Sequence, residues 1–138
     1  MKRRATAVWK GTLKEGKGTI TTQSKVLDSN AYSFNTRFED GQGTNPDELL
    51  AASHAGCFAM ALSNILGQNG FTPDSLEATA VVNMDTDKLE LTESHIKLKA
   101  SIPGIDMEKF LECANTAKDN CPISKALSIK VSLDAELI

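Results

Sequence analysis

Apolar and polar positions alternate near the start of the chain, a pattern that predicts an antiparallel hairpin. The first alternating run covers residues 5–13, and a second run, rich in β-branched residues, covers 19–22. Between them lies KEGKG, whose two glycines favour a turn. A third strand is predicted within residues 31–39, AYSFNTRFE, and the loop DGQGTNP follows it. The N-terminal part of the chain therefore predicts a small antiparallel sheet.

A long run without charge, residues 49–66, predicts a buried helix. Asn45 suits the N-cap, Pro46 the first helical position and Glu48 a capping box, while Gly70 supplies a stop signal. Apolar residues lie on nearly every face of this helix, which must therefore be covered on every side. Four polar residues interrupt the run, and no second candidate for a membrane span exists. We expect a second copy of the chain to cover the remaining faces in a two-fold homodimer. We do not expect the helix to enter a membrane.

The C-terminal half predicts two alternating strands, 76–86 and 89–102, that pair antiparallel. An amphipathic helix follows from Asp106, with an apolar face of Phe110, Leu111, Ala114 and Ala117. CPISKAL predicts a short helix that begins at Pro122, and SIKVSLDAEL predicts the last strand. This order of elements predicts one α+β domain over residues 1–138, with a mainly antiparallel sheet and a long central buried helix.

Composition narrows the possible functions. The chain has 138 residues and a net charge of −3, which argues against nucleic-acid binding because no concentrated basic face exists. The basic start MKRR lacks the apolar segment of a signal peptide, so we expect a cytoplasmic protein. Three cysteines are an odd number without a close pair, which is not a disulfide framework.

Three other kinds of site are weak alternatives. GTLKEGKG has P-loop spacing, but Gly18 stands where Ser or Thr is needed and strand patterns flank it on both sides. Two histidines and three scattered cysteines do not form a zinc motif, so no metal or cofactor is expected. His54, three residues before Cys57, leaves a Cys–His hydrolase conceivable, although a buried, hydrogen-bonded histidine is the more common case. His95 is expected at the surface.

The cysteines are the main candidates for chemistry. Cys57 lies in the apolar run AASHAGCFAMALSN, where it either fills the core or acts as a reactive thiol. Cys121 precedes Pro122 and is predicted to cap the short helix, with its sulfur facing free N–H groups that favour a thiolate. A residue chosen only for its size is the alternative there. Cys113 is expected to fill the core.

Charged residues that could activate a thiol lie upstream. Arg37 stands in a largely apolar segment, where arginine is unusual unless it is exposed or paired. Asp47 and Glu48 share the first helical turn, and Asp47 lies ten residues before Cys57. That separation is about 15 Å along one helix axis. Asp47 and Cys57 can work together only if the acid comes from a partner chain or the helix breaks.

Four segments, FNTRFE, GTNPDELLAASHAGCFAMAL, IPGID and NCPISKAL, resemble the OsmC branch of the OsmC/Ohr hydroperoxide reductases. The resemblance covers nearly the whole chain and implies an intertwined α+β homodimer. It also implies reduction of organic hydroperoxides, and less well of hydrogen peroxide, with lipoyl-type or small dithiols as reductants. A non-catalytic thiol sensor or binding module on the same fold is the alternative.

The resemblance assigns roles to individual residues. Cys57 would attack the peroxide, and Cys121 would resolve the resulting sulfenic acid into a disulfide. Arg37 would activate the thiolate, and Asp47 stands where the family usually has a glutamate that orients this arginine. Glu48 is the alternative acid. The expected apolar walls of the substrate site, which could equally be core residues, are Phe34, Phe38, Leu49, Leu50 and Phe58.

Overall fold

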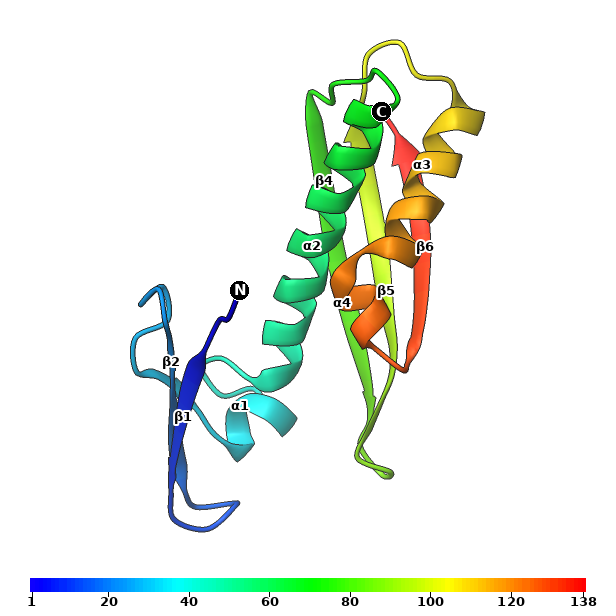
Figure 1. Cartoon of the computed structure of the whole chain (residues 1–138). Coiled ribbons are helices and arrows are strands. Elements are labelled where there is room, and N and C mark those ends of the chain that lie inside the picture. The colour runs from blue at the N-terminus through cyan, green and yellow to red at the C-terminus, as the bar shows by residue number, and fades with distance from the viewer. The chain divides into compact units, whose positions relative to one another are not determined.

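The computed structural model describes all 138 residues, which form two compact units, Met1–Leu49 and Leu50–Ile138. Each unit contains a three-stranded sheet of its own. The long helix α2, Pro46–Gln68, begins in the first unit and continues into the second without a break. The mixed α+β class predicted from the sequence is confirmed (Figure 1).

The first unit is built on an antiparallel sheet in the order β1-β2-β3. Its strands are β1 (Ala5–Lys10), β2 (Lys17–Thr22) and β3 (Asn30–Tyr32). The predicted hairpin is confirmed, with Trp9 paired to Gly18. Gly18 lies beneath two packed rings, since a Cβ there would come 2.4 Å from Tyr32 and 2.7 Å from Trp9. The first three residues of KEGKG thus lie in the hairpin turn, whereas Gly18 lies on β2, where it leaves room for the packed rings of Trp9 and Tyr32.

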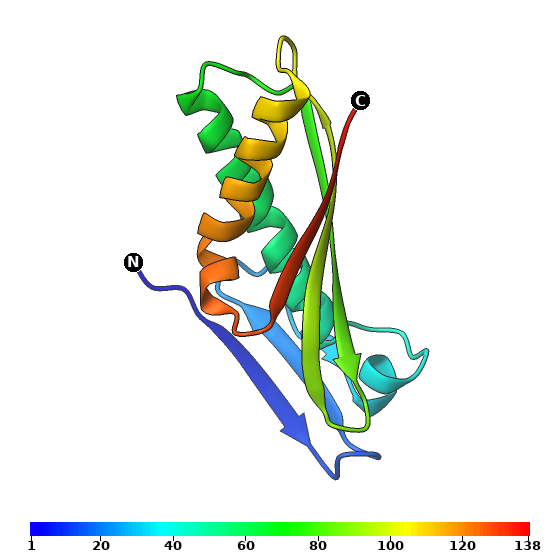
Figure 2. The same cartoon turned by 90° about the vertical axis from the view of Figure 1, so that its right-hand side faces the viewer.

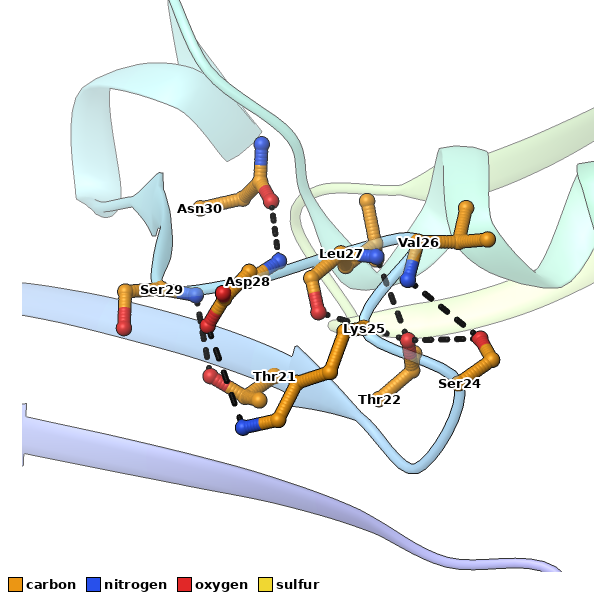
Figure 3. Close-up of polar contacts among 9 residues, drawn as sticks. All are labelled: Thr21, Thr22, Ser24, Lys25, Val26, Leu27, Asp28, Ser29 and Asn30. Atoms are coloured by element: carbon orange, nitrogen blue, oxygen red, sulfur yellow. Dashed lines mark hydrogen bonds and ion pairs between the residues drawn. The ribbon is translucent and has the colours of Figure 1, made fainter.

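The connection from β2 to β3 is fixed by polar side chains at the end of β2 and in the loop (Figure 3). The Thr21 hydroxyl accepts from the Ser29 N–H at 2.9 Å, and the Thr22 hydroxyl accepts from the Leu27 N–H at 3.1 Å. Lys25 and Ser29 have positive φ values of 65° and 54°. Because side chains satisfy the backbone donors, the loop holds these two uncommon conformations.

The predicted strand over residues 31–39 is wrong beyond Tyr32, because the chain turns there into helix α1, Phe34–Phe38. Ser33 caps this helix in a capping box. Its hydroxyl accepts from the Thr36 N–H, and the Thr36 hydroxyl accepts from the Ser33 N–H. This reciprocal pair fixes a helical start that alternation of apolar residues does not reveal. Arg37 therefore lies on a helix.

The second unit places helices on one face of a mixed sheet (Figures 1 and 2). Strand β4 (Ser75–Asp85) pairs antiparallel with β5 (Glu90–Ser101), as predicted. The last strand, β6 (Lys130–Leu137), runs parallel to β5. Helices α3 (Met107–Asn120) and α4 (Pro122–Ala126) form the return connection that a parallel pair requires.

The core of the second unit lies between α2, α3 and the sheet. Leu111 is 39% exposed, so its predicted place on the buried face of α3 is wrong. Cys113 takes that place and is buried. The buried residues of this core cluster are Phe58, Leu62, Leu66, Ile96, Leu98, Ala100, Ile102, Phe110, Cys113, Ala114 and Ala117.

Helix α2 begins as predicted, since the Asn45 side chain accepts from the Glu48 N–H at 2.8 Å. The Glu48 carboxylate accepts from the Thr44 hydroxyl instead of closing a capping box. At the other end Gly70 has a φ of 84°, and the Phe71 N–H reaches the Leu66 carbonyl.

Only one face of α2 is covered within this chain. The buried residues are His54, Phe58, Leu62 and Leu66, while Met60 on another face is 77% exposed. The helix has the length and apolar composition of a membrane span. A helix whose one face belongs to the core of a folded unit is better explained as a core helix that lacks its remaining cover.

Candidate active site

Cys57 and Cys121 meet in the second unit. Helix α2 carries Cys57, and Cys121 stands between α3 and α4. Their sulfur atoms are hydrogen bonded at 2.7 Å, and both residues are free thiols. Cys121 is fully buried, whereas Cys57 is half-buried. Two thiols in direct contact, one of them reachable from solvent, can form a disulfide with little backbone movement.

The predicted capping role of the Cys121 sulfur is wrong. Cys121 occupies the N-cap position of α4, but its side chain makes no capping hydrogen bond. Its sulfur faces Cys57 instead. The backbone N–H of Ile123, in the first turn of α4, also bonds to Cys57. A backbone N–H of the first turn of α4, which was expected to face the Cys121 sulfur, therefore bonds to Cys57 instead.

Within its own unit Cys57 is held mainly as a neutral thiol. Burial raises the pKa of Cys57, and the adjacent Cys121 sulfur raises it further. The Ile123 N–H lowers the pKa of Cys57 but does not offset burial. A nucleophilic thiolate at this position needs a nearby positive charge.

Cys113 is a core residue. It is 2% exposed and packs within α3 against the other core side chains. Burial raises the pKa of the Cys113 thiol, which makes the sulfur less reactive. The expected core-filling role fits this environment.

His54 is fully buried and does not form the Cys–His dyad considered above. Its Nδ1 is 2.7 Å from the Ser94 hydroxyl, and its Nε2 is 2.7 Å from the Ser124 hydroxyl. Both ring nitrogens are thus engaged by serines, and none is left to act as a base toward Cys57. The expectation of a hydrogen-bonded core histidine is confirmed.

His95 is more engaged than a free surface residue. It lies on the polar face of the second sheet, where Nδ1 contacts Ser132 and Nε2 lies 3.1 Å from Asp134. Ser132 also donates to Glu93, and this hydrogen bond is the first cause that lowers the pKa of Glu93. These residues form a solvated charge network on adjacent strands. No group of three or more metal-ligating side chains is present in the structure.

Arg37 and Asp47 form an ion pair in the first unit. Arg37 Nε donates to Asp47 Oδ2 at 3.3 Å, and Nη2 donates to Oδ1 at 3.1 Å. This two-point geometry fixes the plane of the guanidinium group. Glu48 does not contact Arg37 by any hydrogen bond and pairs with Thr44 at 2.7 Å. The geometry favours Asp47 over Glu48 as the acid that orients the arginine.

Arg37 also borders a small apolar cavity of about 270 Å³ in the first unit. Two of the expected wall residues, Phe34 and Phe38, line it, and their rings lie 4.8 Å apart. The Arg37 guanidinium stands 5.5 Å from the centre of the Phe38 ring. The remaining lining residues are Trp9, Leu13, Tyr32, Ser33 and Pro46.

The other three expected wall residues are not among those that line this cavity. Leu49 and Leu50 are half-buried on α2. Phe58 has no exposed surface and belongs to the core of the second unit, so its proposed place in a substrate wall is corrected to packing.

Residues 39–136 match the family described as OsmC-like protein. The chain belongs to the OsmC family. It is 46% identical over 133 residues to "Peroxiredoxin OsmC" of Escherichia coli (strain K12), covering 95% of this chain and 93% of that protein. It is 33% identical over 120 residues to "Organic hydroperoxide resistance protein OhrB" of Bacillus subtilis (strain 168), with 87% and 88% coverage.

Solved structures agree with this membership. The OsmC-family chain aligns with the crystal structure of OhrB of Bacillus subtilis at a TM-score of 0.65 and 27% identity, covering 98% of each chain. An OsmC-like protein from Mycoplasma pneumoniae aligns at 0.77 with 17% identity over 100% of this chain and 98% of that one, which shows the fold. The family resemblance and the fold class expected from the sequence are confirmed.

Several polar contacts of this OsmC-family chain were missed by sequence reasoning. Ser94 occupies a core-facing position of β5, where a polar residue among apolar neighbours could have signalled a buried partner. Ser124 and the Ile123 N–H give no comparable signal. Asn45 makes a second contact, donating from Nδ2 to the Thr36 carbonyl at 3.1 Å, and so connects α1 to the start of α2.

Proposed function

We propose that this OsmC-family protein is a cysteine-based peroxidase that reduces organic hydroperoxides to alcohols, and hydrogen peroxide less well, at the expense of thiols. The observation that carries the proposal is the contact between the half-buried Cys57 thiol and the buried Cys121 thiol. The names of the relatives, a peroxiredoxin and an organic hydroperoxide resistance protein, support the same chemistry.

The first step requires a Cys57 thiolate. Because burial raises the pKa of this thiol, a nearby cation must act against it. We assign that role to Arg37, which lowers a neighbouring thiol pKa by roughly 1–3 units when hydrogen bonded to the thiolate. The thiolate attacks one peroxide oxygen, the O–O bond breaks, and the alkoxide leaves as the alcohol after taking a proton. The guanidinium stabilises the charge that develops on the alkoxide.

The second step uses Cys121. The sulfenic acid on Cys57 condenses with the Cys121 thiol, which forms the disulfide and releases one water molecule. An external dithiol, lipoyl-type or small, then reduces the disulfide by exchange and is itself oxidised. No cofactor takes part in any of these steps.

The acid and the arginine come from a second copy of the chain in this proposal. Helix α2 is continuous, and ten residues place Asp47 about 15 Å from Cys57 along its axis. The uncovered apolar faces of α2 need a partner. We therefore propose an intertwined cytoplasmic homodimer in which both units work as one domain. Arg37 of the partner subunit and Asp47 of the partner subunit then serve each Cys57.

The substrate class follows from the surroundings of Arg37. Phe34 and Phe38 line the cavity beside the guanidinium, and Leu49 and Leu50 add apolar surface on α2. Apolar walls beside one cation favour an alkyl or aryl hydroperoxide over hydrogen peroxide because they bury its carbon chain.

The test measures consumption of cumene hydroperoxide with excess dithiothreitol by the wild type, Cys57→Ser and Cys121→Ser. We expect no turnover with Cys57→Ser, and with Cys121→Ser one rapid oxidation followed by slow recycling. Turnover by Cys57→Ser equal to that of the wild type would reject the peroxidase. Oxidation of the wild type with poor recycling would indicate a sensor, and loss of an esterase activity in His54→Ala would indicate a hydrolase.

A further inference from the structure

The hydrogen-bond network around His54 has no part in the chemistry described so far. His54 is fully buried and bonded to Ser94 and Ser124 at 2.7 Å each. Burial lowers the pKa of His54, so the ring is neutral near pH 7 and carries one donor and one acceptor nitrogen. One serine accepts from the ring and the other donates to it. The three side chains therefore satisfy one another in a site closed to solvent.

This network joins three elements around the two thiols. His54 lies on α2, one helical turn before Cys57. Ser124 lies on α4, three residues after Cys121. Ser94 lies on β5, in the sheet beneath. The ring is thus tied on one side to the sheet and on the other to the short helix that follows Cys121.

Helix α4 has few other means of holding its place. It has five residues, and none of them belongs to the hydrophobic core cluster of the unit. Ser124 is the buried residue of this helix, and its hydroxyl bonds to His54. The hydrogen bond to His54 is therefore the buried polar contact that joins α4 to the rest of the unit.

We propose that His54 is a positioning residue which, through Ser124, holds α4 so that the Cys121 sulfur and the Ile123 N–H stay on Cys57. The inference rests on the proposed function, because it assigns His54 to the reaction of these two thiols. Without the tie α4 moves, the Ile123 donor leaves Cys57, and the Cys121 thiol no longer meets the sulfenic acid. Condensation to the disulfide, with loss of water, then slows.

The experiment compares Ser124→Ala with Ser94→Ala. Each substitution removes one buried hydrogen bond from the same ring, but only Ser124 lies on α4. Two quantities are measured in the full-length protein. One is the pH dependence of Cys57 alkylation by iodoacetamide, followed by peptide mass mapping. The other is the share of Cys57 trapped by dimedone as sulfenic acid after one equivalent of cumene hydroperoxide.

For Ser124→Ala we expect the midpoint of Cys57 alkylation to fall, because the Cys121 sulfur raises the pKa of Cys57 more than the Ile123 N–H lowers it, and both move away with α4. Dimedone should trap most of the Cys57 in this variant and little of it in the wild type. Ser94→Ala should behave as the wild type in both measurements, although both variants lose stability. Equal shifts in the two variants, or no shift in Ser124→Ala, would overturn the proposal.

A second pair of variants keeps the test decisive if Ser124→Ala does not fold. His54→Gln keeps a polar group near the position of Nε2, and His54→Asn keeps one near Nδ1. We expect His54→Gln to keep wild-type alkylation and disulfide formation, and His54→Asn to show the same changes in alkylation and dimedone trapping as Ser124→Ala. The reverse order would overturn the proposal. Alkylation needs no peroxide, so a wild type without peroxidase activity would reject the proposed function while the positioning role is still tested.

Discussion

Cys57 is the one thiol of the three that solvent reaches, and its own unit works against its ionisation. Cys113 has the same side chain but no polar partner, and core packing explains it. Cys121 is buried and in contact with Cys57, a position that suits a second thiol waiting for an oxidised first one. Reactivity at this scale depends on exposure and neighbours and not on residue type.

The acid beside Arg37 gives the first prediction. Asp47→Asn removes the carboxylate that bonds the guanidinium at two points, whereas Glu48→Gln changes a residue bonded to Thr44. We expect Asp47→Asn to lower the second-order rate constant with cumene hydroperoxide roughly tenfold, the effect of losing a charge-assisted hydrogen bond. Glu48→Gln should have a much smaller effect. The larger loss in Glu48→Gln would reassign the role of the acid.

The buried His54 gives a prediction about stability and pH. Because the fold lowers the pKa of His54 from 6.5, the unfolded chain binds a proton more readily than the native one. The neutral His54 ring contributes fully to the free energy of unfolding when the pH is above the pKa of His54 in the unfolded chain. This contribution is lost as the pH falls through the lower pKa of His54 in the folded protein. The protonation of His54 changes the free energy of unfolding by at most about 1.4 kcal/mol per pH unit.

Urea unfolding of the wild type and of His54→Gln, at about pH 7.5 and about pH 5.5, checks this prediction. The free energy of unfolding should fall more between these two conditions in the wild type than in His54→Gln. All other titratable groups are present in both proteins, so their contributions cancel in the comparison. An equal decrease in the free energy of unfolding in both proteins would show that protonation of His54 does not affect stability.

Single residues were predictable where a local pattern carries the information. Asn45 as a cap and Cys57 within an apolar helix follow from neighbours in the chain. The partners of His54 lie 40 and 70 residues away, and such pairs exist only after the chain has folded. The contact of Cys57 with Cys121 was implied by the family resemblance and not by their separation in sequence.

Short elements were the least predictable part of the fold. Residues 34–38 were assigned to a strand because aromatic residues in a short run suit both structures, and the Ser33–Thr36 capping box decides for a helix. The direction of β6 also escaped prediction, since alternation reveals a strand but not its pairing. The long helix and the β4–β5 hairpin were predictable because their patterns extend over many residues.

At the scale of elements, Asn45 connects the helix that carries Arg37 with the helix that carries Asp47. Asn45→Ser keeps a good N-cap for α2 but is too short to reach the Thr36 carbonyl. We expect unchanged helix content by circular dichroism and a several-fold lower rate with cumene hydroperoxide, because Arg37 is less well placed. A wild-type rate would show that the link from Asn45 to Thr36 has no role in activity.

The single chain leaves much of the apolar surface of its longest helix uncovered. Helix α2 buries one face in the second unit and leaves apolar residues such as Met60 in solvent. The sequence predicts this need for cover, because apolar residues lie on all sides of the helix.

A mixed dimer of Cys57→Ser and Arg37→Ala chains tests whether the sites are shared between copies. If each Cys57 uses the arginine of the other chain, one of the two sites keeps both residues. The mixed dimer should then show about half of the wild-type activity, although each parent homodimer is inactive. An inactive mixed dimer would indicate that both residues come from the same chain.

The parallel pairing of β5 and β6 makes α3 part of the return path along the sheet, and Cys121 stands at the end of α3, directly before α4. The length of α3, fourteen residues, therefore sets the position of the Cys121 sulfur. Deleting one residue from its exposed face would rotate everything downstream by about 100° and draw it back by about 1.5 Å. Substitutions on the exposed face of α3 should therefore leave the two thiols in contact, whereas a change in the length of the helix should move one thiol away from the other.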